Sequence, residues 1–270
     1  MAIRPADHGI FAGTGGALQP VAAYFGGGFT NALTTIIDKV AFADDSLTTL
    51  GTGLSQARYN LGSAANSGVA GYFAGGGAYS STTTTDKFAF PGDGRTTLGT
   101  GLSAAIQALS GAANSGVAGY FAGGYEGGYQ STVDKFAFPA DSRTTLGTGL
   151  SVARSKTGGA ANSGVAAYFA GGDDGSYSDT VDKFAFPGDG RTTLGTGLSS
   201  ARQHLAGFAN SGVAGYFGGG WLNPRVTTVD KFAFPGDGRS TLGTGLAVAL
   251  SALAGAANSG VAGYFGGGST

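Results

Sequence analysis

The feature that most constrains the fold of this chain is a repeat of 48 residues without insertions or deletions. A Tyr-Phe pair followed by a glycine-rich segment recurs at every 48th residue, at Tyr24, Tyr72, Tyr120, Tyr168, Tyr216 and Tyr264. Asp-Lys pairs recur with the same spacing, at Asp38, Asp86, Asp134, Asp182 and Asp230. Since a period of about 20–50 residues is typical of stacked supersecondary units, we expect one continuous architecture.

Each unit divides into four strand-like pieces, which we name a, b, c and d. In the last full copy they are residues 201–210, 212–219, 228–234 and 240–246. Piece b is apolar on both faces, as expected of a strand that is covered on both sides. Asn-Ser-Gly links a to b, and Pro-Gly-Asp-Gly or Pro-Ala-Asp-Ser links c to d. Such short turns are typical of hairpins, and no segment has a helical period.

Four antiparallel strands in about 50 residues match one blade of a β-propeller. The chain is therefore predicted to be all-β. The 54 glycines fit tight turns, whereas 41% apolar residues are too many for a disordered tract.

The units resemble kelch repeats, the galactose-oxidase type of propeller blade. The resemblance covers about residues 31–270 and rests on an apolar strand ending in a glycine doublet (120–124), an aromatic strand (136–138) and a Leu-Ser-x-Ala-Arg segment. The kelch Trp is absent, and Ile106 and Leu250 replace the arginine in two copies. The near-identical copies are also similar to propeller-like repeats of bacteriophage tail and virion-surface proteins.

The distribution of pieces predicts how the ring closes. Pieces c and d occur first at 34–53, four full sets follow from about 57 to 245, and a and b return at 249–267. Joining the two ends gives a five-bladed propeller without exposed sheet edges. Six incomplete blades are the alternative. Residues 1–30 then remain as an N-terminal arm that serves as an anchor, an oligomer contact or an extra strand, and residues 31–270 form the propeller.

Composition excludes several classes of protein. A net charge of −1 with 11% charged residues indicates no nucleic-acid partner, and no apolar run is long enough to insert into a membrane. The N-terminus lacks the pattern of a secretory signal, and the absence of cysteine excludes disulfides and thiolate metal sites.

Two tracts vary among the otherwise near-identical copies. One is the b–c loop, at 28–35, 77–84, 125–132, 173–180 and 221–228. The other is the d–a crossover, at 56–63, 104–111, 152–159, 200–207 and 248–255. In an up-and-down blade both tracts lie on one face of the disc, and the constant turns lie on the opposite face. Diverse loops on a rigid frame favour recognition.

Aromatic and polar side chains of the b–c loops are the candidate ligand-binding residues: Tyr79, Tyr125, Tyr129, Tyr177, Trp221, Asn223 and Arg225. Aromatic rings with polar neighbours are typical of interfaces and sugar-binding surfaces. The alternative is that these side chains pack onto adjacent blades.

No catalytic residues are predicted. The repeated aspartates, such as Asp86, are expected to make structural hydrogen bonds or ion pairs, because a catalytic site needs one asymmetric set. Neither His8 nor His204 has a partner at a recognisable spacing. Asp173, Asp174 and Asp179 are weak candidates for Ca²⁺ binding, but a solvated acidic loop is the simpler interpretation, so no cofactor is expected.

These observations predict a non-enzymatic structural or binding protein of a virion or extracellular surface, within a larger assembly. Its expected partner is a host-surface glycan or a neighbouring structural protein. The alternatives are an assembly protein without a ligand and, less favoured, a propeller enzyme.

Overall fold

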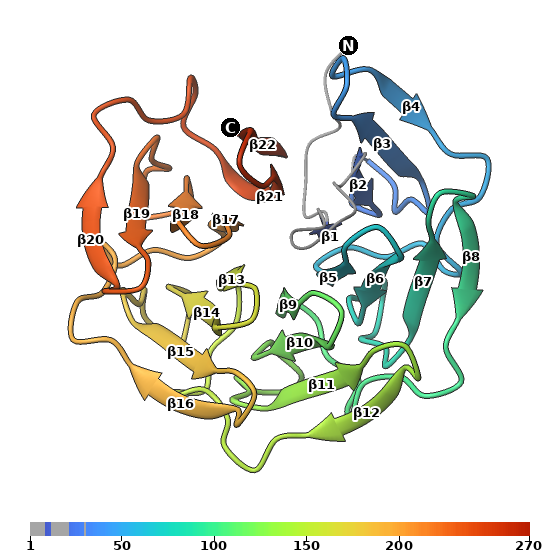
Figure 1. The fold of residues 1–270 in the computed structure, drawn as a ribbon, viewed down its shortest axis with the longest axis horizontal. Helices are drawn as coiled ribbons and strands as arrows, with labels where there is room; N and C mark the ends of the chain where they lie inside the picture. Colours follow the sequence, from blue (N-terminus) through green and yellow to red (C-terminus); the bar gives the residue numbers. More distant parts are fainter. Residues whose placement is uncertain (1–8, 12–21, 30) are drawn as a thin grey trace.

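The sheets of this protein are arranged around a central axis, as Figure 1 shows. The computed structural model describes residues 9–11, 22–29 and 31–270. In that part of the chain the strands form five four-stranded antiparallel sheets and one two-stranded sheet. The prediction of an all-β, five-bladed propeller is therefore confirmed.

Each blade takes its four strands from consecutive segments of the chain. The first blade contains β1 (Gly9–Phe11), β2 (Ala22–Gly26), β3 (Ile37–Ala41) and β4 (Leu47–Thr49). The second contains β5 (Gly62–Asn66), β6 (Ala70–Ala74), β7 (Thr85–Ala89) and β8 (Gly94–Thr97). The third contains β9 (Ser110–Asn114), β10 (Ala118–Ala122), β11 (Val133–Ala137) and β12 (Ser142–Thr145).

The fourth blade contains β13 (Gly158–Asn162), β14 (Ala166–Ala170), β15 (Val181–Ala185) and β16 (Gly190–Thr193). The fifth contains β17 (Ala206–Asn210), β18 (Ala214–Gly218), β19 (Val229–Ala233) and β20 (Gly238–Thr241). The last sheet contains β21 (Ser251–Asn258) and β22 (Ala262–Ser269).

The predicted piece d is shorter than expected and begins earlier, because the chain leaves the sheet after Thr241. Gly245 passes so close to the carbonyl of Thr227 that a Cβ there would lie 2.3 Å from its oxygen. The Leu-Gly-Thr-Gly-Leu segment is therefore the start of the crossover to the next blade.

The predicted closure by one composite blade is wrong. β3 pairs with β2 and β4, and among the described strands β22 pairs with β21 alone. Tyr24 lies opposite Lys39 in the same register that places Tyr72 opposite Lys87. Since the local hairpin closes a far shorter loop than a pairing between the chain ends, residues 22–26 take the second position of the first blade. They match the extra-strand alternative for the arm. Residues 1–8, 12–21 and 30 of the arm lie outside the described residues.

The two ends of the chain nevertheless meet through side chains. β21 packs against β17 on one side and against β1 on the other. Phe25 and Ala256 belong to one buried cluster with Phe42 and Tyr264 at its border. Tyr264 donates a hydrogen bond to Asp45 at 2.9 Å and stacks on Phe42. The two-stranded sheet thus links the fifth blade to the first.

The turns opposite the variable loops form a repeated network between blades. Between the second and third blades, Ser67 N–H donates to Ser115 Oγ at 2.9 Å, and Gly116 N–H donates to Asn66 Oδ1 at 2.9 Å. In the same way Gly164 N–H donates to Asn114 Oδ1, and Gly212 N–H donates to Asn162 Oδ1. This face is a uniform scaffold. Within the described residues no helix is long and apolar enough to cross a membrane.

Candidate functional site

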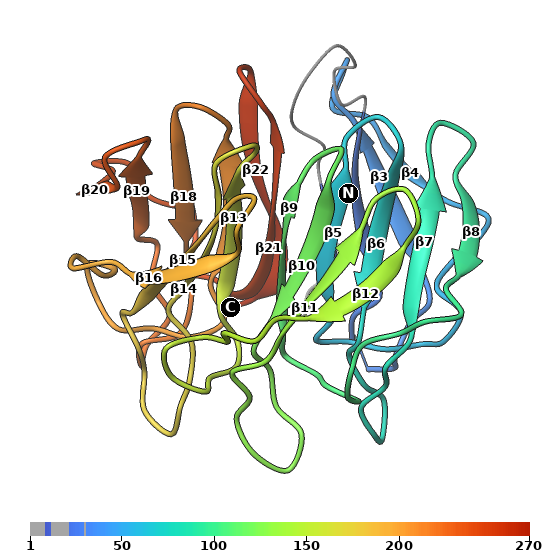
Figure 2. The same ribbon diagram turned by 60° about the horizontal axis from the view of Figure 1, so that its bottom comes forward.

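The b–c loops and the d–a crossovers share one face, which we call the loop face. Short β-bridges join the two tracts within the blades, between Tyr59 and Gly77, Gln107 and Tyr125, Ser155 and Asp173, and Gln203 and Trp221. Figure 2 shows the b–c loops of the second, third and fourth blades projecting together from the lower side of the disc. The predicted convergence of the variable tracts is confirmed.

Several predicted ligand residues bond to the neighbouring blade. Tyr129 Oη donates to Asp173 Oδ1 at 3.0 Å, and Trp221 Nε1 donates to Tyr177 Oη at 2.8 Å. Arg225 stacks over the Trp221 ring at 4.6 Å. Its Nε and Nη2 donate to Ser251 and Ser269. Tyr125 packs edge-on against Tyr129. For this part of the loop face, the alternative of packing between blades describes the contacts well.

Tyr79 differs from these residues because its side chain is fully exposed, at 104% relative accessibility. It borders a groove of about 460 Å³ between the first two b–c loops. The groove is lined by Phe29, Asn31, Ala32, Leu33, Tyr59, Ala78 and Tyr79. Phe29 is itself 47% exposed, and its ring lies 6.3 Å from that of Tyr59. We call this site the aromatic groove.

Sequence reasoning missed Phe29 and Tyr59 as members of this site. Phe29 occupies the loop position of Tyr125 and Trp221, so aligning the repeats could have identified it as a candidate. Tyr59 lies in the crossover, which strand order places on the same face, and the bridge from Tyr59 to Gly77 shows which loop it adjoins.

A second, more polar groove of about 310 Å³ lies between the fifth blade and the β21–β22 sheet. Its lining includes Gln203, His204, Trp221, Arg225 and Ser251. Asn223, at the exposed tip of the same loop, has a positive φ of 70° and is absent from the lining. The structure therefore brings Trp221 and Arg225 together with His204, and leaves Asn223 apart.

One crossover residue from each of five successive units surrounds the axis on the loop face. Asn60, Ala108, Lys156, His204 and Ala252 all have φ between 54° and 58°. Each of the last four donates its N–H to the carbonyl of the preceding one, at 2.7–2.9 Å. They line an axial cavity of about 100 Å³, too small for more than a few water molecules.

His204 in this ring gives the protein an expected sensitivity to acid. Burial lowers the pKa of His204 from 6.5 to about 4, helped by the charge of Lys156 and opposed by that of Asp173. Because the unfolded chain binds this proton more readily, stability should fall as pH drops from about 6.5 to about 4, by roughly 2–3 kcal/mol.

The His204→Asn variant tests this expectation, since Asn60 occupies the same position and conformation in another unit. Urea unfolding at pH 7 and pH 4.5 should show a smaller loss for the variant than for the unchanged chain. Equal losses would contradict a role for His204.

Two carboxylates of the acidic loop accept hydrogen bonds from protein groups. Asp173 accepts hydrogen bonds from Lys156 at 2.9 Å and from Tyr129, and Asp174 accepts from Ser176 in the same turn. Across the residues that the structure describes, no three His, Asp or Glu side chains gather as metal ligands would. Asp173, Asp174 and Asp179 thus lack the geometry that the Ca²⁺ hypothesis requires.

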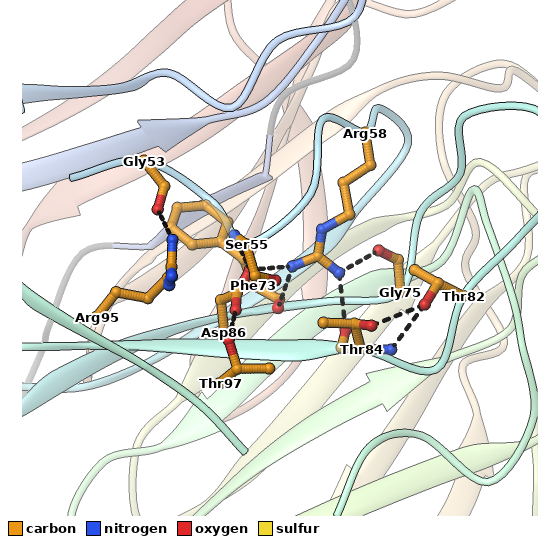
Figure 3. Close-up of polar contacts among 10 residues, drawn as sticks. All are labelled: Gly53, Ser55, Arg58, Phe73, Gly75, Thr82, Thr84, Asp86, Arg95 and Thr97. Atoms are coloured by element: carbon orange, nitrogen blue, oxygen red, sulfur yellow. Dashed lines mark hydrogen bonds and ion pairs between the residues drawn. The ribbon is translucent and has the colours of Figure 1, made fainter. Parts of the chain in front are cut away.

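The repeated aspartates are buried structural hubs, as Figure 3 shows for Asp86. Asp86 Oδ2 accepts bonds from Ser55 N–H and Oγ at 2.9 Å and from Arg58 at 2.7 Å, and Oδ1 accepts from Thr97. Arg58 also donates to the carbonyls of Gly75 and Thr84. The hub joins the crossover to β7 and β8, so the predicted structural hydrogen bonds and ion pairs are confirmed.

Comparisons with known proteins show the fold alone. No protein-family model matches the chain, and no curated protein matches its sequence. Among solved structures, one titled "Structure of YjhT" is similar, with a TM-score of 0.72 over 94% of this chain and 88% of that chain. The sequence identity is 12%, so the similarity carries the propeller architecture and no activity.

Proposed function

We propose that this chain is a non-enzymatic recognition module that binds a carbohydrate through the loop face of its propeller. The observation that carries this proposal is the aromatic groove, where the exposed rings of Phe29 and Tyr79 stand beside Tyr59. Rings of this kind provide contact area at little cost in conformational entropy. Asn31 adds a side-chain amide that can donate to and accept from sugar hydroxyls.

The setting we propose is a virion or another extracellular surface, in which the propeller is part of a larger assembly. The resemblance of the repeats to phage tail proteins supports this setting, with a host-surface glycan as the partner. Display of many copies would raise the avidity of a weak single site by about 10²–10⁴.

A second candidate is a purely structural role, in which the loop face touches a neighbouring protein of the assembly or no ligand. The bonds from Tyr129 to Asp173 and from Trp221 to Tyr177 favour it, because they use loop side chains to join blades.

The Tyr79→Ala variant separates these candidates. We expect the unchanged chain to bind a subset of a glycan array and the variant to bind it about tenfold more weakly, because a hot-spot ring is lost. Val165→Ser is a matched control, since Val165 is 43% exposed on the opposite face. Absence of glycan binding by the unchanged chain, with retention of an envelope protein in a pull-down, would instead support the structural role.

A further inference from the structure

A tyrosine–lysine–aspartate triad joins each of the first four blades to the next one. A tyrosine of the second strand and a lysine of the third hold one aspartate from the outer turn of the following blade. Tyr72 Oη donates to Asp141 at 2.7 Å, and Lys87 Nζ donates to the same carboxylate at 2.6 Å. The same contacts recur in Tyr24–Lys39–Asp93, Tyr120–Lys135–Asp189 and Tyr168–Lys183–Asp237.

The fifth blade has the tyrosine and the lysine without the aspartate. Lys231 Nζ lies 5.9 Å from the centre of the Tyr216 ring, close to the 5.3–5.5 Å of the other pairs. No carboxylate of the described residues bonds to either side chain, because the next sheet contains only β21 and β22. Tyr216 is also less buried than its counterparts. Tyr216 and Lys231 therefore keep the arrangement that holds a carboxylate in the other blades, without a carboxylate from the described residues.

The backbone beside this site is open as well. In the complete blades the second strand pairs on both sides, as β18 does with β17 and β19. β22 pairs with β21 alone among the described strands, and Ala262 and Gly263 are exposed. An unpaired edge presents N–H and C=O groups that another strand can bond.

The surrounding residues define what such a strand would carry. In the filled interfaces Phe138 and Phe234 stack on the tyrosine of the preceding blade, and a Cβ at Gly119 or Gly215 would lie 3.3 or 3.4 Å from their rings. Here Phe208 stacks on Tyr216 at 5.1 Å, and a Cβ at the equivalent glycine, Gly263, would lie 2.1 Å from its ring. Phe208 thus occupies the space beside the tyrosine ring that Phe138 and Phe234 occupy elsewhere, which we call the aromatic slot. An incoming strand therefore needs a small residue at this position.

The crossover before β21 departs from its repeats in the same region. Ala247 and Leu250 stand where Ser199 and Arg202 bond to the buried Asp230 of their own blade. A strand added to β22 would therefore place an apolar side chain, and not a carboxylate, opposite these two residues.

We propose that β22 and the Tyr216–Lys231 pair form a docking site for a β-hairpin of a partner polypeptide. The hairpin adds its first strand to β22. It carries an apolar residue opposite Ala247 and Leu250 and a small residue beside Phe208, and an Asp or Glu of its turn bonds to Lys231 and Tyr216. This site lies away from the loop face, so it is independent of carbohydrate binding.

The probe is a labelled synthetic peptide of residues 226–241, the outer hairpin of the fifth blade, with Asp230→Val and Phe234→Ala. It retains Asp237, the turn carboxylate held by Tyr168 and Lys183. We expect saturable binding to the full chain in a fluorescence-anisotropy titration. Replacing Asp237 with Asn in the peptide should weaken binding about tenfold, as should Lys231→Met in the chain.

Lys183→Met is the matched control, because Lys183 already holds the chain's own Asp237, and it should leave peptide binding unchanged. The peptide-side change leaves the protein untouched, so it gives a result even if Lys231→Met unfolds. No saturable binding up to about 1 mM, or binding that ignores both changes, would overturn the proposal.

A size swap checks the position of the hairpin. Phe208→Ala restores the residue type of Ala64, Ala112 and Ala160, and reopens the aromatic slot. That variant should prefer the peptide that retains Phe234, whereas the unchanged chain should prefer the Phe234→Ala peptide. The same preference in both proteins would contradict the proposed docking geometry.

Discussion

Replacing Gly159 with alanine is expected to destabilise the protein by about 3 kcal/mol or more and to disrupt the ring. Gly159 lies in β13, on the innermost strand of the fourth blade. A Cβ built there would lie 2.2 Å from the carbonyl oxygen of Gly111 in β9. Since backbone, not a flexible side chain, occupies that space, relief requires the two blades to move apart.

The same close approach recurs around the axis. Gly207 would meet the carbonyl of Gly159 at 2.5 Å, and Gly255 that of Gly207 at 2.5 Å. These glycines set the spacing of the inner strands, and with it the positions of all the loops.

Thermal unfolding followed by circular dichroism measures this effect. Gly195→Ala is the control, because nothing lies within 4 Å of the Cβ position and its φ is not positive. We expect the control to stay within about 0.5 kcal/mol of the unchanged chain. Equal stability of the two variants would contradict the close approach of Gly159 to the carbonyl of Gly111.

Removal of a hub carboxylate is the second change with a large expected effect. Asp182→Ala leaves Arg154 buried without a counter-charge, and both side chains are fully inaccessible. Breaking a buried pair in this way costs about 3–5 kcal/mol. The carboxylate also accepts bonds from Ser151 and Thr193, which lose their partner.

Arg154→Ile should cost far less, about 1 kcal/mol, although it breaks the same ion pair. The third blade already has Ile106 at this position, and Asp134 there keeps its bonds from Ser103 and Thr145. Urea unfolding of the two variants gives the comparison. If Arg154→Ile is as damaging as Asp182→Ala, the hub depends on the ion pair more than on the hydroxyl bonds.

Much of this fold could be predicted from the sequence, because the repeat supplies several copies of each local signal. The glycine doublet after Phe121 takes the positive φ that ends β10, and the Asn-Ser-Gly turn has Gly116 at φ 79°. Such local geometry depends on neighbouring residues alone. The shared face of the two variable tracts followed from strand order, and the bridge between Gln107 and Tyr125 confirms it.

The closure of the ring could not be read in this way. The strand at residues 37–41 could pair either with residues 22–26 or with the C-terminal strand, because both carry the same pattern of side chains. Only the three-dimensional arrangement shows that β2 takes it and that Tyr264 reaches Asp45. The sequence shows Phe208 at a position where other units have alanine. That Phe208 stacks on Tyr216 of the neighbouring strand is shown by the structure alone.

The candidate site was predicted as a face and not as a set of residues. Tyr129 and Trp221 have the composition of binding residues, yet their polar atoms bond across blades. Among the described residues no hydrogen bond joins the Tyr79 side chain to another blade. The groove beside it includes Tyr59 from the crossover, which strand order placed on the same face but not beside a particular loop residue.

The most direct test of the central claim, that recognition resides in the variable loops and folding in the repeated frame, is a uniform-loop variant. The four segments that align with residues 173–180 in the 48-residue repeat are each replaced by a copy of residues 173–180. These segments are 29–36, 77–84, 125–132 and 221–228. Each copy has an aspartate at the position of Asp173 and a tyrosine at the position of Tyr129, so the hydrogen bond between neighbouring loops is kept. We predict an unchanged melting temperature and complete loss of the array binding shown by the unchanged chain. Full binding by the uniform-loop variant would contradict the claim.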